Sequence, residues 1–83
     1  MNNFSRVHDL KILPKFYDDV VSCKKNFEIR FNDRDFRVGD VIVLRPFEHG
    51  HYFDKEPIPK IIKYVLYDFD FPGIREGFVI LGL

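Results

Sequence analysis

Apolar and polar residues alternate in short runs along this chain, and this period of two constrains the fold more than any other feature. Residues 7–13 and 27–31 alternate, and residues 41–44 form a continuous apolar run directly after a turn. Successive side chains of a strand point to opposite faces, so such runs are typical of short β-strands. Segments 60–67 and 77–81 have the same character. The sequence therefore predicts several short strands without a regular alternation of strands and helices.

One segment departs from this pattern and predicts a single early helix. Pro14 suits the first turn of a helix, where its missing N–H group is not needed. Phe16, Val20 and Cys23 then recur at helical spacing. The helix is expected to end near Ser22 or Cys23.

Turn residues divide the rest of the chain. Asn and Asp in 32–35 and the Gly-Asp pair at 39–40 are typical of turns, and residues 46–59 read as a long irregular connection with its tip at 48–51. These elements predict one α+β domain over residues 1–83. We expect it to be mainly β, as a mixed β-barrel with a helix after the first strand.

Length and composition limit the class of protein. A chain of 83 residues forms one small domain, and an aromatic content of 17% is too high for a disordered segment. The single cysteine excludes an intrachain disulfide and a cysteine-based zinc cluster. No apolar run reaches the ~20 residues that span a bilayer, and the N-terminus lacks a secretory signal, so we expect a cytoplasmic protein with no membrane segment. The formal net charge of zero means that any nucleic-acid binding must be local.

Residues 27–31 contain the most informative charged pair. Their apolar residues share one face of the predicted strand, while Glu28 and Arg30 share the other. We expect the apolar face to pack on the core and the charged face to form a compact site with Lys25 from the preceding turn. The alternative is a solvated strand face, on which an exposed ion pair contributes only about 0–1 kcal/mol.

Residues 23–30, Cys-Lys-Lys-Asn-Phe-Glu-Ile-Arg, resemble the Gly-x-Lys-x-x-Glu-x-Arg signature of ASCH domains. These domains are a branch of the PUA-like superfamily that is associated with RNA and modified nucleosides. Lys25, Glu28 and Arg30 match the signature, and Cys23 stands where the family has glycine. The chain is most similar to a small prokaryotic subgroup of undescribed function, and the resemblance implies a PUA-like barrel. It covers nearly the whole chain, including segments 8–12, 14–21, 32–36, 38–44 and 76–80.

The resemblance implies a binding module for RNA, a nucleotide or a modified nucleoside. In such a site Arg30 would hold a phosphate or a base edge through its planar guanidinium, and Lys25 would act as a point charge at the mouth. Glu28 would accept a hydrogen bond from an exocyclic amine or hold Arg30 in place.

Three further residues are candidates for the same site. The resemblance gives His8 and Lys11 a role in the pocket, although His8 shares a strand face with Leu10 and Ile12 and is equally well interpreted as a satisfied, partly buried histidine. Tyr52 lies in the long connection, where its ring is a candidate for stacking on a base.

The alternative function is a small hydrolase of the amidohydrolase type that acts on a modified nucleoside. Some ASCH relatives hydrolyse N-acetylated cytidine with the signature lysine, a threonine nucleophile at the position of Glu28 and a distant glutamate, for which Glu76 is the nearest candidate. Because Glu28 replaces the nucleophile, Lys25 and Glu28 would be catalytic only if Glu28 served as a general base for water. Neighbouring cations weaken a carboxylate as a base, so binding is favoured over hydrolysis. A protein-interaction adaptor is a third possibility.

The remaining reactive residues predict neither a metal site nor a cofactor. His49 and His51 flank a glycine in a predicted loop, and no third ligand is placed beside them. Cys23 follows the helix, where the negative end of the helix dipole disfavours a thiolate nucleophile. If this position requires the positive φ of the signature glycine, Cys23 is strained.

Overall fold

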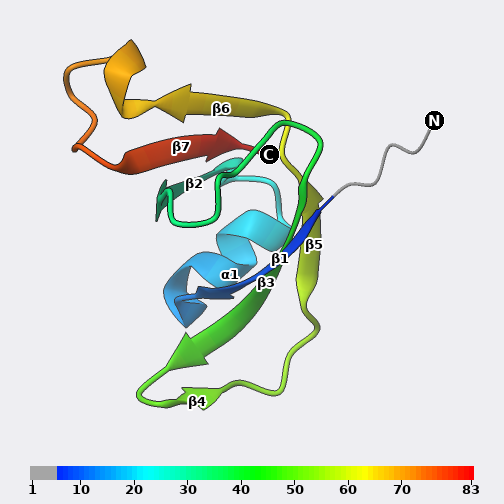
Figure 1. The fold of residues 1–83 in the computed structure, drawn as a ribbon. Coiled ribbons are helices and arrows are strands. Elements are labelled where there is room, and N and C mark those ends of the chain that lie inside the picture. The colour runs from blue at the N-terminus through cyan, green and yellow to red at the C-terminus, as the bar shows by residue number, and fades with distance from the viewer. Residues whose placement is uncertain (1–5) are drawn as a thin grey trace.

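Two β-sheets and one α-helix form residues 6–83, the part of the chain that this computed structural model describes (Figure 1). The first sheet contains β1 (Val7–Ile12), β3 (Val41–Glu48), β4 (His51–Tyr52) and β5 (Ile58–Ile61). Strand β1 runs parallel to β3, whereas β4 and β5 are antiparallel to it. The sheet is therefore mixed, as predicted.

The second sheet is antiparallel and has the order β2-β7-β6. It is formed by β2 (Phe27–Phe31), β7 (Phe78–Gly82) and β6 (Tyr64–Tyr67). The helix α1 (Pro14–Val21) begins at a proline and follows β1, which confirms the predicted early helix. A short 3₁₀ helix (Asp68–Asp70) follows β6.

Among residues 6–83, backbone hydrogen bonds join the two sheets along one side. Between β5 and β6 the chain passes from the first sheet to the second: the N–H of Ile62 donates to the carbonyl of Asp40, and the N–H of Lys63 to that of Gly82, both at 2.8 Å. On the other side, β1 and β2 are edge strands of different sheets. A mainly β, α+β domain is therefore confirmed, but within residues 6–83 the strands do not close into a barrel.

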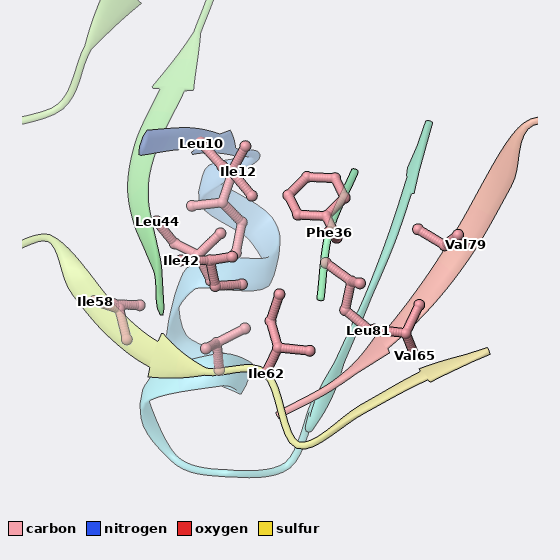
Figure 2. Packing of buried hydrophobic residues seen from close by; sticks show 11 residues of the cluster. Leu10, Ile12, Phe36, Ile42, Leu44, Ile58, Ile62, Val65, Val79 and Leu81 are labelled. Atoms are coloured by element: carbon pink, nitrogen blue, oxygen red, sulfur yellow. The ribbon is translucent and has the colours of Figure 1, made fainter. Parts of the chain in front are cut away.

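The core lies between the sheets and receives side chains from both (Figure 2). In β1, His8, Leu10 and Ile12 are buried and the alternate residues are exposed, as the sequence predicted. Val20 is the fully buried residue of α1. The apolar core consists of Leu10, Ile12, Val20, Phe36, Ile42, Leu44, Ile58, Ile62, Val65, Val79 and Leu81.

The predicted irregular connection over 46–59 is wrong in its first part. Strand β3 continues to Glu48 and turns back into β4 through His49 and Gly50, whose φ values of 54° and 81° are those of a tight hairpin turn. The rings of Phe47 and Tyr52 pack across this hairpin with centroids 4.8 Å apart. Such cross-strand aromatic pairs stabilise a hairpin beyond what turn residues alone indicate.

Segment 60–67 was predicted as one strand, and the structure divides it into β5 and β6. Ile62 is fully buried between them, and its backbone bonds to Asp40 while that of Lys63 bonds to β7. The adjacent apolar pair Ile61-Ile62 marks the place where β5 ends, because Ile61 is exposed and Ile62 is buried.

The expected orientation of β2 is also wrong. Phe27, Ile29 and Phe31 are 43%, 58% and 56% exposed, whereas Glu28 is buried. Cross-strand partners share a face, and Glu28 is paired with Leu81, a core residue of β7. The register with β7 thus turns the charged face of β2 inward and its apolar face outward.

Candidate ligand-binding pocket

A pocket of about 410 Å³ lies at the open seam between β1 and β2. One wall comes from the end of β1 and the residue that follows it, and a second from Phe16 of α1. The remaining walls come from Lys25 and from β2 itself, residues 27–30. The pocket therefore occupies the place where the two edge strands would have to pair to close a barrel.

Glu28 is the buried charge of this pocket, and two cations hold it. Lys25 Nζ lies 2.5 Å from Glu28 Oε1, and Arg30 Nη2 lies 3.1 Å from Oε2. Arg30 Nε also donates to Oε2 at 3.2 Å. Each carboxylate oxygen thus has its own cation, and the three residues that match the ASCH signature converge as predicted. A buried carboxylate is tolerated when it is paired and hydrogen-bonded in this way.

Arg30 also spans the seam between the two sheets. Its Nη2 donates to the backbone carbonyl of Lys11 in β1. The side chain of Lys11 points elsewhere, since its Nζ lies 4.2 Å from the ring centroid of Phe47. Lys11 lines the pocket, and its backbone carbonyl accepts the bond from Arg30.

Aromatic rings flank the charged group. Lys25 Nζ lies 5.2 Å from the ring centroid of Phe16 and 4.9 Å from that of Phe27. It also donates to the carbonyl of Phe27 at 2.7 Å. The sequence predicted both rings on packing faces and not as pocket walls; for Phe27, its nearness in sequence to Lys25 was the available signal. Apolar walls around a few polar groups are typical of small-molecule sites.

The turn that delivers Lys25 depends on Cys23. This residue has a φ of 63°, in the left-handed region, and its N–H donates to the carbonyl of Val20 at 3.1 Å. The N–H of Lys25 then donates to the carbonyl of Asp19 at 2.9 Å. The expectation that Cys23 occupies a glycine-type conformation is confirmed, and its side chain is exposed.

His8 lies outside the pocket, in a second buried polar cluster. Its Nε2 is 2.9 Å from Asp40 Oδ2, which also accepts from Arg6 at 2.8 Å and from the N–H of Arg37 at 3.1 Å. Phe36 packs against the imidazole edge to face, with centroids 4.9 Å apart. The structure thus agrees with the interpretation of His8 as a satisfied core histidine.

The carboxylate of this cluster was missed in the sequence, where Asp40 was assigned only to a turn. Burial on its own would raise the pKa of Asp40, but hydrogen bonds from His8, the Arg37 backbone and Arg6 outweigh it. The pKa of Asp40 consequently lies below its ordinary value. No signal in the sequence connected Asp40 with His8, which lies 32 positions away.

Tyr52 lines a different hollow, of about 400 Å³, on the outer side of the first sheet. Asp9, Arg45 and Lys55 contribute charged groups to this hollow, and Arg45 Nε is 2.8 Å from Asp9 Oδ1. Tyr52 is exposed and packs on Phe47. The structure therefore does not bring Tyr52 to the seam pocket.

The remaining candidates lie outside the pocket. Glu76 is an exposed turn residue before β7, and His49 and His51 lie at the tip and start of the β3–β4 hairpin. Within the described residues, no group of three His, Cys, Asp or Glu side chains is placed to hold a metal ion. No helix of residues 6–83 has the length and apolar character needed to cross a membrane.

Comparison with known proteins gives a family and one curated relative. The model of the family described as a domain of unknown function, DUF3850, matches residues 7–83. An uncharacterized 12.9 kDa protein in the GpA 3' region of Escherichia phage P2 is 33% identical over 46 residues. This alignment covers 55% of the chain and 42% of the phage protein, so the chain spans less than half of that relative.

Proposed function

The chain belongs to the DUF3850 family, whose description assigns no function, and we propose from the seam pocket that it is a cytoplasmic binding module for RNA, a nucleotide or a modified nucleoside. The observation that carries this proposal is the convergence of Lys25, Glu28 and Arg30 in one cavity. The same three residues carry the resemblance to ASCH domains, and we extend the proposal to a PUA-like origin of the fold.

The donors that remain after the internal bonds indicate what the pocket accepts. Lys25 Nζ uses two of its three protons, on the carbonyl of Phe27 and on Glu28. Arg30 donates through Nε and Nη2, and among the contacts of residues 6–83 its Nη1 has no acceptor. Both side chains are partly exposed. Two cations against one carboxylate leave one positive charge, which suits a phosphate oxygen or the carbonyl edge of a base.

The walls of the pocket fit a flat ring. Phe16 and Phe27 both lie close to the Lys25 ammonium, and rings of this kind stack on bases with little regard to sequence. A volume of about 410 Å³ is in the range of small-molecule sites. A single nucleotide, free or at the end of an RNA strand, meets these conditions.

The contacts of Glu28 oppose the hydrolase alternative. Both of its oxygens already hold a cation, so neither is directed at a water in the pocket. Glu76, the candidate for the second catalytic glutamate, is exposed and outside the cavity. We therefore expect no release of cytidine from N-acetylcytidine by the wild-type protein, and turnover that is lost in Lys25→Met and Glu28→Gln would make the protein a hydrolase.

The proposal is tested by following backbone amide NMR signals during titration with cytidine 5'-monophosphate and with a short single-stranded RNA. Shifts should gather in residues 11–13 and 25–30, with little change around Asp40. Shifts confined to the hollow beside Tyr52, or no shifts up to millimolar ligand, would contradict the proposal.

A matched pair of lysine variants localises the binding. Lys25→Met keeps an aliphatic side chain beside the two rings and removes the ammonium, whereas Lys24→Met changes an exposed neighbour outside the pocket. We expect Lys25→Met to weaken RNA binding about tenfold and Lys24→Met to have little effect. Because few phosphates are contacted, the slope of log K against log salt should have a magnitude of about 1–3. Equal loss in both variants, or a slope near −8, would indicate diffuse surface binding instead.

A further inference from the structure

The outer face of the second sheet is apolar along its whole width. Its central row is Ile29, Ile80 and Leu66, contributed by β2, β7 and β6 in register. On one side of this row Phe31 is paired with Phe78. Figure 2 shows Val65, Val79 and Leu81, the alternate residues of β6 and β7, projecting toward the first sheet, so the residues between them point away from the core.

The other side of the central row is exposed. Phe27 and Tyr64 flank Gly82, and a Cβ at Gly82 would lie only 3.1 Å from Tyr64 Cβ. Tyr64 is 63% exposed, and all three apolar residues of β2 are exposed as well. Contiguous exposed apolar faces of this kind are rare on monomeric proteins and typically mark interaction sites.

The chemistry of this face is that of an interface core. Four of its seven side chains are aromatic, and none is charged. Interface cores are enriched in aromatic residues and depleted of charge, with polar groups at the rim. A rim group is present, since the guanidinium of Arg75 lies 5.7 Å from the ring centroid of Phe78.

From these observations we infer that the outer face of the β2-β7-β6 sheet is the interface of a two-fold symmetric homodimer. The partner is a second copy because the face offers no charge by which a charged partner would be selected, whereas an apolar, uncharged face matches a second copy of itself. A formal net charge of zero also means that two copies do not repel each other. Two such sheets pack face to face at about 10 Å, each presenting the same residues to the other.

The area of the face agrees with a stable dimer. A fully exposed aromatic residue offers about 200 Å², so the exposed fractions of Phe27, Ile29, Phe31 and Tyr64 provide about 450 Å². The partly exposed residues of the face raise this to roughly 600 Å² per copy. Two copies would then bury about 1,200 Å², the lower end of the range for specific interfaces. Phe27 and Ile29 also line the seam pocket, so the face and the pocket share two residues; the inference itself rests on the sheet face and not on a ligand in the pocket.

The test is sedimentation equilibrium of the full chain from about 1 to 300 μM. The wild type should dissociate in the micromolar range, and Tyr64→Asp, which places a carboxylate on the face of both copies without touching the pocket, should raise the dimer dissociation constant at least tenfold. Val7→Asp is the matched control, because Val7 is 65% exposed but lies in the first sheet. Circular dichroism melts check that each variant folds.

A second variant keeps the test decisive if Tyr64→Asp does not fold. Phe31→Asp acts at the opposite corner of the same face and should also produce a monomer. A wild type that stays monomeric at 300 μM would overturn the dimer and leave the face to another protein. Dissociation by Val7→Asp with no effect of Tyr64→Asp or Phe31→Asp would move the interface to the first sheet and overturn it equally.

Discussion

Residues 6–83 contain two buried carboxylates, both of which are paired with cationic side chains but only one of which borders a pocket. Asp40 lies directly before β3 of the first sheet, where His8, Arg6 and a backbone N–H converge on its carboxylate; His8 is buried, and Arg6 reaches the carboxylate from the surface. Glu28 belongs to the second sheet, where Lys25 and Arg30 hold it at the wall of a cavity. Both side chains are less than a tenth exposed. Burial and ion pairing alone therefore do not identify a functional site, and the adjoining cavity is what distinguishes Glu28.

The same contrast separates the roles of the donors. Around Asp40, His8 is itself buried, and its Nε2 is held by the carboxylate. Arg6 is exposed, but it does not line the seam pocket. Around Glu28, both cations are partly exposed and retain donor capacity toward the pocket. The Asp40 cluster consequently stabilises the fold, whereas the Glu28 cluster is free to exchange contacts with a ligand.

The largest expected change in the free energy of unfolding comes from removing the carboxylates, which tests the difference between Asp40 and Glu28 directly. Asp40→Ala leaves buried His8 and the N–H of Arg37 without their acceptor, so we expect it to lower the free energy of unfolding by about 3 kcal/mol. Glu28→Ala frees two cations that can reach water through the pocket, and we expect a loss of about 1 kcal/mol. Urea unfolding of both variants measures this difference. Equal losses would show that the Glu28 cluster is as structural as the Asp40 cluster.

The stability of the protein in acid tests the role of Asp40, because the pKa of Asp40 is lowered in the folded protein. A carboxyl whose pKa is depressed by folding contributes stability above its unfolded pKa of about 4, and this contribution is lost as the pH falls through the folded pKa. The stability difference between wild type and Asp40→Ala should therefore shrink as the pH is lowered below about 4. Thermal melts of both proteins from pH 6 to pH 2 measure this. A difference that stays constant over the range would contradict the role assigned to Asp40.

The two sheets also explain how far the sequence could predict the fold. In β1 the alternation identified both the strand and its buried face, because one set of residues is mostly apolar and the other mostly polar. In β2 the alternation identified the strand but gave the wrong face, because period two groups side chains without stating which group meets the core. That choice depends on the register with β7, some 50 residues away in the sequence. The contact of Arg30 across the seam and the exposure of the apolar face of β2 both depend on residues far apart in the sequence, so local patterns do not predict them.

The candidate site was predictable to a similar extent. Lys25, Glu28 and Arg30 are local in sequence, and their convergence follows from one strand face and the turn before it. The contact between Arg30 and the carbonyl of Lys11 joins two edge strands, and it depends on the placement of the two sheets relative to each other. Tertiary structure also separates His8 and Tyr52 from the pocket. His8 pairs with Asp40, which is distant in sequence, and Tyr52 belongs to the β3–β4 hairpin, which was not predicted.

A smaller effect tests the inverted polarity of β2. Ile42 is fully buried in β3, and Ile29 is exposed in β2. Deleting one methylene with Ile42→Val should cost about 1 kcal/mol, whereas Ile29→Val should change the free energy of unfolding by less than about 0.5 kcal/mol. Thermal melts below 1 μM keep self-association out of the measurement. A cost at Ile29 equal to that at Ile42 would mean that the outer face is covered even in the monomer.

The smallest expected effect concerns the turn that delivers Lys25 to the pocket. Cys23 holds a φ of 63°, which strains a residue with a Cβ, and its exposed side chain contributes little packing. Cys23→Gly should therefore stabilise the domain by about 0.5–1 kcal/mol, while Cys23→Ala, which keeps the Cβ, should leave stability nearly unchanged. Parallel urea titrations of the two variants separate relief of strain from loss of the thiol. If the turn alone positions Lys25, ligand binding should also be unaffected by Cys23→Gly. A clearly less stable glycine variant would instead show that the Cys23 side chain, with its 4.0 Å contact to Lys60 Nζ, contributes more than the strain costs.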